Sequence, residues 1–387
     1  MRYSYICSEC DRSFDISSDL MVCPHCSEEQ KPNQPLRGVL EVLIEGKVER
    51  DFDIFDLLPV EREYFPPIPV GGTPLWTPLN LRRITGFSEL YIKDDSLNPT
   101  GSLKDRASYL VAAFARREGL TKVVVASTGN AASSMAGVGA AADLKIRIFI
   151  PASAPQAKRV QALQYGAEVV LVDGNYDRAY ELSMEYTREH GGLNRNTAYN
   201  PLTIEGKKTA ALEIYKQLGE APDFVFVPTG DGVIIGGMYK GFKDLLNLGL
   251  IEKIPIMYAV QAEGSCAICR ALETKVFSES YQSKTVADSI AVDVPRNGFY
   301  ALTYLEAYNG RGVTVEDGEI IAAQRMLAST TGLFAEPAAS AALAGFLKEK
   351  GNIPTSAKVV LLVTGNGLKD IDAAMQGVLS RDKISNV

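Results

Sequence analysis

Three features are missing from this chain of 387 residues, and each absence narrows what the protein can be. No stretch approaches the roughly 18 consecutive apolar residues that a membrane-spanning helix needs. The start, "MRYSYICSEC", lacks the basic residues and the apolar run of a secretory signal. Positive charge is not in excess, because 47 acidic against 40 basic residues give a net charge of −7. We therefore expect a cytoplasmic protein that binds neither a nucleic acid nor a membrane.

Cysteine is scarce, yet four of the six cysteines form two C-x2-C pairs close to the N-terminus. Thiolates at this spacing can hold a tetrahedral zinc ion from two tight turns. Four thiolates leave no open position for catalysis, so such a zinc would be structural. The sequence predicts a zinc-ribbon-like segment over residues 1–35, and a metal-free knuckle whose thiols only pack is the alternative. The expected zinc ligands are Cys7, Cys10, Cys23 and Cys26.

A second C-x-x-C, formed by Cys266 and Cys269, has no partner pair nearby. A free cysteine behaves as a small apolar residue, so we interpret these two as packing at the start of a helix.

Short apolar runs alternate with helical patterns through most of the chain. "KVVVAS", "IRIFI" and "AEVVLVD" form one such series, and "DFVFVPTG", "IPIMYAVQAEG" and "KVVLLVTGNG" form another. Strands that alternate with helices indicate parallel sheets with crossover helices, which is the α/β class. We expect a smaller α/β domain over residues 113–199. The larger catalytic domain is expected to combine residues 36–112 with 200–387, and to include a strand in "RGVLEVLIEG" (37–46).

Polar turns follow several of these strands, and parallel sheets bind ligands at the carboxyl ends of their strands. In "ASTGNAAS", Ser127, Thr128 and Asn130 open a helix whose N–H groups favour an anion, although they could also be simple helix caps. In "VPTGDGVIIGG", the glycines allow a backbone to approach a phosphate closely, although Asp231 among them is unusual for such a cradle. The alternative is a tight turn that needs glycine for packing.

One lysine, Lys104, lies in the flexible polar stretch "NPTGSLKDRA" where a loop enters a helix. A lysine removed from water can lose its proton near neutral pH and attack a carbonyl carbon. The alternative is a solvated surface cation, and only the surrounding residues can decide.

The motifs in their order along the chain carry a resemblance to a known family. "N-P-T-G-S-x-K-D-R", "S-T-G-N-A-A", the glycine-rich loop, "Q-A-E-G", "E-P-A-A-S-A-A" and "T-G-N-G-L-K-D" resemble the fold type II family of pyridoxal-phosphate enzymes. This family has the tryptophan synthase β-like fold, and its threonine synthase branch is the most similar. The resemblance covers nearly all of the chain after residue 65. It implies a small amino-acid substrate and a homodimer.

The resemblance also implies a role for individual residues. Lys104 would bind the cofactor covalently and move protons, Asn130 would contact its phenolic oxygen, and Thr364 would face its pyridine nitrogen. Ser127 and Thr128 would hold the substrate carboxylate, and Thr203 falls on the substrate side of the site. The cofactor phosphate would be bound at Gly230, Asp231, Gly232, Val233 and Ile234.

The chain departs from the branch pattern where the substrate phosphate is handled. Threonine synthases usually read N-P-x-R-x-E-G-Q-K-T, whereas this chain reads "NPLTIEGKKT" with Thr203 in place of the arginine. A guanidinium that clamps a phosphate is hard to replace by a hydroxyl. The cations that could act instead are Arg195, Lys207, Arg159 and Arg296.

Four functions therefore stay open at this point. The first is the threonine synthase reaction, from O-phospho-L-homoserine and water to L-threonine and phosphate. The second is a serine or threonine dehydratase, the third a β-replacement enzyme acting on phosphoserine, and the last a binding protein that kept only the fold.

Overall fold

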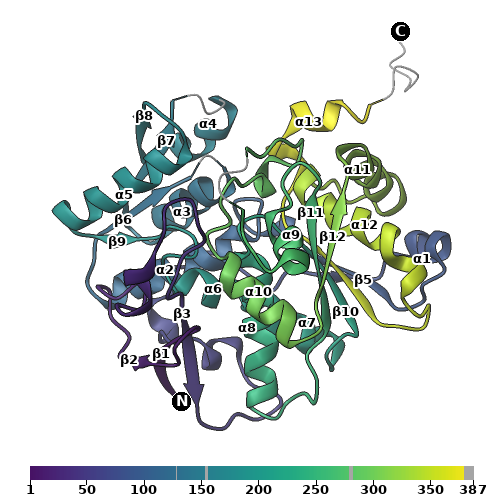
Figure 1. Ribbon diagram of the computed structural model, residues 1–387, viewed down its shortest axis with the longest axis horizontal. Helices are drawn as coiled ribbons and strands as arrows, with labels where there is room; N and C mark the ends of the chain where they lie inside the picture. The colour runs from purple at the N-terminus through teal and green to yellow at the C-terminus, as the bar shows by residue number, and fades with distance from the viewer. Residues whose placement is uncertain (128, 153–155, 279–281, 379–387) are drawn as a thin grey trace.

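The structure of the chain is a computed structural model that describes residues 1–127, 129–152, 156–278 and 282–378. Within these residues the strands form three sheets, two in α/β units and one at the N-terminus (Figure 1). No helix in the described ranges is both long and apolar enough to cross a bilayer.

The larger α/β unit is built on a six-stranded sheet of order β12-β11-β10-β13-β5-β4, which is parallel except for β4 at its edge. Its strands are β4 (Leu75–Trp76), β5 (Leu90–Asp94), β10 (Phe224–Pro228), β11 (Ile256–Ala262), β12 (Arg311–Val315) and β13 (Val359–Val363). Alternate residues of β10 point to opposite faces, so Val225 and Val227 pack in one apolar cluster and Phe226 packs in another. Both faces are buried, which explains why these strands are continuous apolar runs.

Helices cover both faces of this sheet. Helix α8 packs with Val225 and Val227 on one face, and α12 packs with Phe226 on the other. The helices of this unit are α1 (Leu79–Thr85), α2 (Lys104–Arg117), α6 (Leu202–Lys207), α7 (Thr209–Leu218), α8 (Val233–Asn247), α9 (Ala267–Thr274), α10 (Gly298–Ala307), α11 (Asp317–Thr331), α12 (Pro337–Glu349) and α13 (Ile371–Met375).

The smaller α/β unit has a four-stranded parallel sheet of order β8-β7-β6-β9. Its strands are β6 (Lys122–Ala126), β7 (Lys145–Pro151), β8 (Glu168–Val172) and β9 (Leu193–Asn194), and its helices are α3 (Asn130–Ala141), α4 (Gln156–Gln164) and α5 (Tyr176–His190). The two parallel sheets with crossover helices confirm the predicted fold class. The exact domain boundaries stay a prediction.

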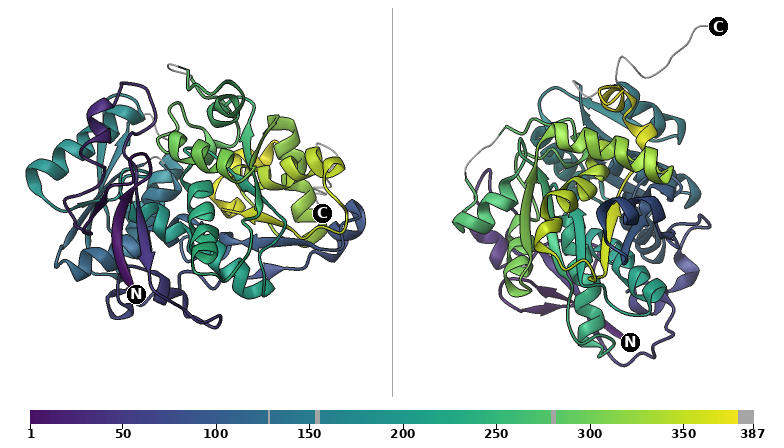
Figure 2. Two further views of the ribbon diagram at one scale, coloured as in Figure 1. Left: turned by 60° about the horizontal axis from the view of Figure 1, so that its bottom comes forward. Right: turned by 90° about the vertical axis from the view of Figure 1, so that its right-hand side faces the viewer.

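The N-terminal segment forms an antiparallel sheet of order β2-β1-β3. Its strands are β1 (Arg2–Cys7), β2 (Ser13–Phe14) and β3 (Leu40–Glu45). The sequence assigned the strand at 37–46 to the larger domain, but β3 pairs with β1 along its whole length, from Cys7 opposite Leu40 to Arg2 opposite Glu45. In the left view of Figure 2, these purple strands and the yellow C-terminal strand lie in different halves of the molecule.

Candidate active site

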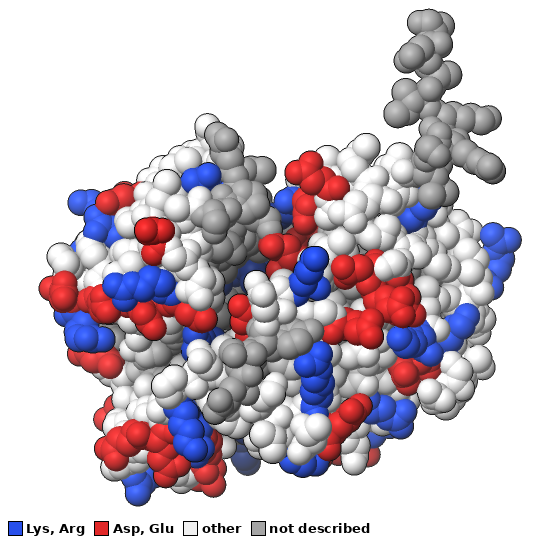
Figure 3. Space-filling model, turned by 45° about the horizontal axis from the view of Figure 1, so that its top comes forward, with Lys and Arg blue, Asp and Glu red and all other residues white. Residues whose placement is uncertain are grey.

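A cavity of about 240 Å³ lies where the two α/β units meet, in the hollowed face shown in Figure 3. Four residues of its wall come from three separate motifs of the sequence: Lys104 at the start of α2, Ser127 after β6 with Asn130 at the start of α3, and Asp231 before α8. The structure thus brings together residues that each follow a strand or open a helix. A second cavity of about 850 Å³ adjoins it and shares Asn130 in its wall.

Lys104 is the first residue of α2 and one of the groups that line the smaller cavity. The N–H of Leu103 donates to the carbonyl of Thr364 at 2.9 Å, so the end of β13 fixes the start of this helix. Loss of hydration lowers the pKa of the Lys104 amine, and the nearby Asp231 only partly opposes this shift. Its Nζ has no hydrogen-bond partner among the described residues. Such an amine is poised to act as a nucleophile.

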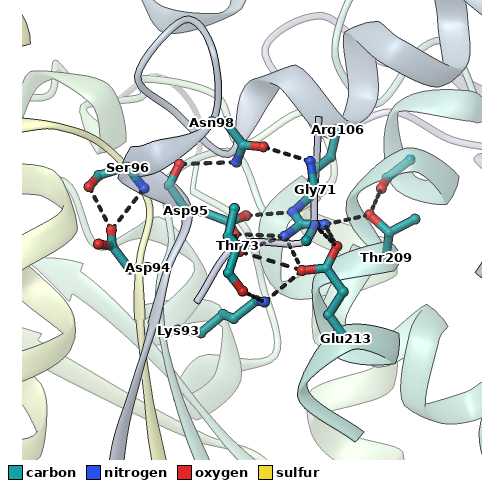
Figure 4. Close-up of polar contacts among 12 residues, drawn as sticks. Gly71, Thr73, Lys93, Asp94, Asp95, Ser96, Asn98, Arg106, Thr209 and Glu213 are labelled. Atoms are coloured by element: carbon teal, nitrogen blue, oxygen red, sulfur yellow. Dashed lines mark hydrogen bonds and ion pairs between the residues drawn. The ribbon is translucent and has the colours of Figure 1, made fainter. Parts of the chain in front are cut away.

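Helix α2 is anchored by a buried ionic cluster that we call the anchor cluster: Lys93, Asp95, Arg106 and Glu213 (Figure 4). Arg106 on α2 pairs with Asp95 at 2.6 Å and with Glu213 at 2.6 Å. Lys93 on β5 pairs with the other oxygen of Glu213, also at 2.6 Å. The cluster therefore ties the first turn of α2 to β5 and α7, and it holds Lys104 in register with the cavity.

Asn130 is oriented by a buried carboxylate. Its Nδ2 donates to the two oxygens of Glu336 at 3.1 and 3.0 Å, and to Ser289 at 3.2 Å. Burial raises the pKa of Glu336, and the hydrogen bonds from Asn130 partly counter this. A side chain in place of Gly365 would collide with the Glu336 carboxyl and displace it from Asn130, so glycine at the turn after β13 keeps this contact in place.

The glycine-rich loop before α8 presents backbone N–H groups. Gly232 has φ +88°, in the left-handed region that favours glycine, and directly precedes α8. The carboxylate of Asp231 accepts from the N–H of Val233 at 3.0 Å, so this acid caps the helix. The N–H groups of Ile234 and Ile235 precede the first helical bond, from Gly236 to Gly232, and have no acceptor in the described part of the chain.

Two fully buried cations near this loop lack a counter-ion. The Nη2 of Arg195 has no partner in the described ranges, and its Nε has only a 3.4 Å bond to Ser108. The Nζ of Lys207 donates to the carbonyl of Thr203 at 3.2 Å, and the structure records no ion pair for it within those ranges. Desolvation lowers the pKa of both groups, that of Arg195 to about 10. A buried anion is what such groups would bind.

The remaining predicted residues fall in different places. Ser127 accepts from the N–H of Gly129 at 3.2 Å and lines the cavity, and Thr128 lies outside the described residues. Thr364 is buried beside Leu103, which donates to its carbonyl. Thr203 is fully buried, and its hydroxyl donates to the carbonyl of Asn200 at 2.8 Å instead of lining the cavity.

Sequence reasoning gave no role to Glu336 and Ser289, although Glu336 begins the motif "E-P-A-A-S-A-A". Arg195 and Lys207 were considered only as replacements for the missing arginine. Lys207 did carry a signal, because it stands where the family pattern E-G-Q-K-T has glutamine.

The four N-terminal cysteines converge as predicted, with their Sγ atoms all within 4.8 Å of one another. The Cys7–Cys26 and Cys10–Cys23 Sγ distances are both 3.7 Å. Four thiolates around a tetrahedral zinc with bonds of about 2.3 Å would lie about 3.8 Å apart. The donor set and its spacing therefore fit a zinc ion. Cys266 and Cys269 are buried at the start of α9, as expected.

Comparison with known proteins places the chain in a family. Residues 68–365 match the family described as pyridoxal-phosphate dependent enzyme, and the chain belongs to this family. It is similar to the threonine synthase of Methanocaldococcus jannaschii, with 34% identity over 96% of this chain and 94% of the relative. The threonine synthase of Mycobacterium tuberculosis is 36% identical, over 84% and 89% of the two chains.

The fold is also similar to that of solved structures. A crystal structure of threonine deaminase from T.th. superposes with a TM-score of 0.65 at 25% identity, and it covers 76% of this chain and 92% of that one.

The groups around Lys104 fit pyridoxal phosphate. An unpartnered lysine amine faces the cavity and unpaired N–H groups lie at the start of α8. Lys207 packs against α8 through its Cβ, which is 2.7 Å from the position a side chain at Gly237 would take, and its ammonium interacts electrostatically with Asp231 of the loop. Together these groups offer one nucleophile and a donor set for a phosphate ester.

Proposed function

We propose that this chain is a pyridoxal-phosphate-dependent lyase of the threonine synthase type. It would convert O-phospho-L-homoserine and water into L-threonine and phosphate. The observation that carries the proposal is the unpartnered amine of Lys104 in the cavity wall, next to Asn130 and Asp231. Threonine synthases that match nearly the whole chain support the choice of reaction.

The cofactor would be held by groups from both α/β units. Lys104 would bind it covalently, Asn130 would contact its phenolic oxygen, and Thr364 would face its ring nitrogen. The loop from Gly230 to Ile234 would bind its phosphate ester, with Lys207 behind the loop. When bound, pyridoxal phosphate supplies the electron sink that makes protons on the α- and β-carbons of an amino acid removable.

The side chains of this protein would then bind, orient and exchange protons. Ser127 and Thr128 would hold the substrate carboxylate at the N-terminus of α3, where the helix field favours an anion. The Nζ of Lys104 would take the proton from the α-carbon and return a proton later, which requires a neutral amine. Glu336 acts as a positioning residue, because its carboxyl fixes the amide of Asn130.

The test combines a spectrum with a product analysis. The purified protein with pyridoxal phosphate should show a visible absorbance band that borohydride abolishes. It should release phosphate from O-phospho-L-homoserine in equal amount to the threonine formed. A protein that stays colourless would contradict the cofactor assignment, and inert O-phospho-L-homoserine would contradict the substrate assignment.

A serine or threonine dehydratase is the second candidate. It is favoured by Thr203 at the position of the usual arginine, and by the likeness to the threonine deaminase structure. Formation of a keto acid and ammonia from serine or threonine, with no phosphate release from O-phospho-L-homoserine, would establish this alternative.

We also propose that the N-terminal cysteines bind one structural zinc ion per chain. Metal analysis of the reduced protein should find close to one zinc, and Cys10→Ser should remove it. Cys269→Ser is the matched control, because it alters the other C-x-x-C pair and should keep the zinc. Zinc retained in Cys10→Ser would contradict the proposed ligand set.

A cytoplasmic location and a homodimer stay predictions. Light scattering on the purified protein would give the mass of the particle and decide between one chain and two.

A further inference from the structure

Thr203 occupies the position of the usual arginine, but its side chain cannot bind the substrate phosphate in place of that arginine. It is fully buried, and its hydroxyl is engaged by the carbonyl of Asn200 within the same helical turn. A substrate that carries a phosphate ester would therefore need a cation from elsewhere in the cavity wall. The inference below rests on the proposed function, because it concerns the substrate of that same site.

The other cations near the cavities are already engaged or lie elsewhere. Arg296 lines the smaller cavity but pairs with Asp177. Lys369, in the wall of the larger cavity, donates to three oxygens, at 2.7 to 3.0 Å. Lys207 and Arg159 line neither cavity among the described residues.

Apart from Lys104, which the proposed function assigns to the cofactor, Arg195 is the cation that lines the smaller cavity and lacks a counter-ion in the described part of the chain. Its backbone N–H donates to the carbonyl of Val124 at 2.8 Å, which fixes its backbone to the middle of β6. Its Nε reaches Ser108 of α2 at 3.4 Å, so Arg195 contacts β6 through its backbone and α2 through its guanidinium. The side chain is fully buried, yet its Nη2 atom has no hydrogen-bond partner in the described ranges.

A buried guanidinium without a counter-ion is unfavourable unless a ligand supplies the anion. A guanidinium can donate two parallel hydrogen bonds to a phosphate, and an ammonium cannot reproduce this geometry. We propose that Arg195 binds the phosphate group on the side chain of the substrate, in place of the arginine that is absent at position 203. The substrate class is then an L-amino acid with a phosphate ester at the end of its side chain.

The anion that binds Arg195 could also be the phosphate group of the cofactor. The structure favours the substrate as the source. The loop before α8 already offers unpaired N–H groups, and Lys207 packs against α8. Arg195 comes from the segment after β9, and it shares the cavity wall with Tyr176 and Thr197 as well as with Asp231 of the loop. The experiment therefore measures both phosphates separately.

The variants are Arg195→Gln, Arg195→Lys and the control Arg178→Gln, which removes an arginine from an exposed pair with Glu181 on α5. Inorganic phosphate is titrated calorimetrically into each protein loaded with pyridoxal phosphate, and KM for O-phospho-L-homoserine is measured. We expect Arg195→Gln to weaken phosphate binding and raise KM by about 10- to 100-fold, as for loss of a charge-assisted hydrogen bond. Arg195→Lys should recover part of this loss, and Arg178→Gln should match the parent protein.

Pyridoxal phosphate is titrated in parallel into the cofactor-free proteins, and the visible band reports folding and loading. Unchanged affinity for inorganic phosphate in a loaded Arg195→Gln variant would overturn the proposal. So would a loss confined to the affinity for pyridoxal phosphate, since the anion would then belong to the cofactor.

Failure of the proposed function gives a different result. In that case the parent protein forms no threonine, while the Arg195-dependent binding of inorganic phosphate still holds. If Arg195→Gln fails to fold, the comparison of Arg195→Lys with the parent protein decides, because a lysine keeps the charge but not the paired geometry.

Discussion

Two ionic groups flank the start of α2, one with its charges paired and the other with its cations unpaired. In the anchor cluster, Arg106 meets Asp95 and Glu213 at 2.6 Å. The second group, which we call the cavity cluster, consists of Lys104, Arg195 and Asp231 in the wall of the smaller cavity, together with Lys207, which interacts with all three but lines neither cavity in the described ranges. None of its three cations has an ion pair in the described part of the chain. Lys104 and Arg106 are two residues apart on one helix, so their side chains leave it in different directions.

The pKa values of Glu213 and Arg106 reflect the difference, although burial lowers the pKa of Lys93 as well. Burial opposes the ionisation of Glu213, but Arg106 and Lys93 outweigh it and hold the pKa of this carboxyl at about 2. In the cavity cluster burial prevails, and the pKa values of Lys104, Lys207 and Arg195 are all lowered. Paired charges fix the scaffold, whereas the unpaired charges beside the cavity are available for a ligand.

The largest expected effect is that of Lys104→Ala. It should abolish the visible band and lower kcat by at least about 10⁴-fold, because it removes the covalent and proton-moving group. The thermal midpoint of the cofactor-free protein should not fall, since an uncompensated buried amine is lost. Lys253→Ala, at an exposed lysine, is the control. A Lys104→Ala variant that keeps the band would refute the assignment.

Lys93→Met tests the anchor cluster. It leaves Glu213 with one cationic partner fewer in a buried setting, and we expect a loss of about 3 to 5 kcal/mol in the free energy of unfolding. Urea denaturation of the cofactor-free protein measures it. A loss below about 1 kcal/mol, which is usual for an exposed pair, would show that the cluster does not anchor the helix.

The acid stability of the protein should depend on Glu213. Its folded pKa of about 2 is below the value of about 4.3 expected in an unfolded chain. The pairing thus contributes up to about 3 kcal/mol above pH 4.3, and this is lost as the pH falls through 2. Glu213→Gln should flatten the fall in urea midpoint over this range. Equal slopes for parent and variant would contradict the pKa.

The smallest effect is expected for Lys207→Met, and it has the opposite sign to that of Lys93→Met. Removing a buried cation that has no counter-ion should raise the stability of the cofactor-free protein by about 1 kcal/mol, since it removes a desolvation cost. The same variant should bind pyridoxal phosphate more weakly. A loss of stability as large as that of Lys93→Met would show that the two clusters do not differ.

The sequence predicted those parts of the molecule that local pattern controls. The runs at 122–127 and 358–367 became strands β6 and β13, and the polar turn after β6 placed Ser127 and Asn130 in one cavity with Lys104. The four N-terminal cysteines converge as their spacing predicts. Parallel strands end at the same edge of a sheet, so the turns that follow them could be expected to line one cavity without knowledge of the fold in detail.

Contacts between distant segments were beyond this reasoning. The alternation in 37–46 predicted a strand but could not reveal that its partner is β1. Lys104 and Arg106 are both basic residues of one motif, and their different environments depend on Glu213, which is more than a hundred residues away. The hydroxyl of Thr203 donates to the carbonyl of Asn200, just before its own helix, which a sequence match cannot show.

The N-terminal sheet is not an exchangeable module, because its third strand supplies part of the core of the larger unit. The carboxylate of Glu41 on β3 accepts hydrogen bonds from the hydroxyls of Tyr300 at 2.7 Å and Tyr304 at 3.1 Å. In the linker before β3, the backbone N–H of Leu36 donates to the carbonyl of Arg296, a residue that lines the smaller cavity. A chimera that exchanged this segment for another ribbon would leave two buried phenols without their acceptor. Any engineered substitute therefore has to bring its own acid at the position of Glu41.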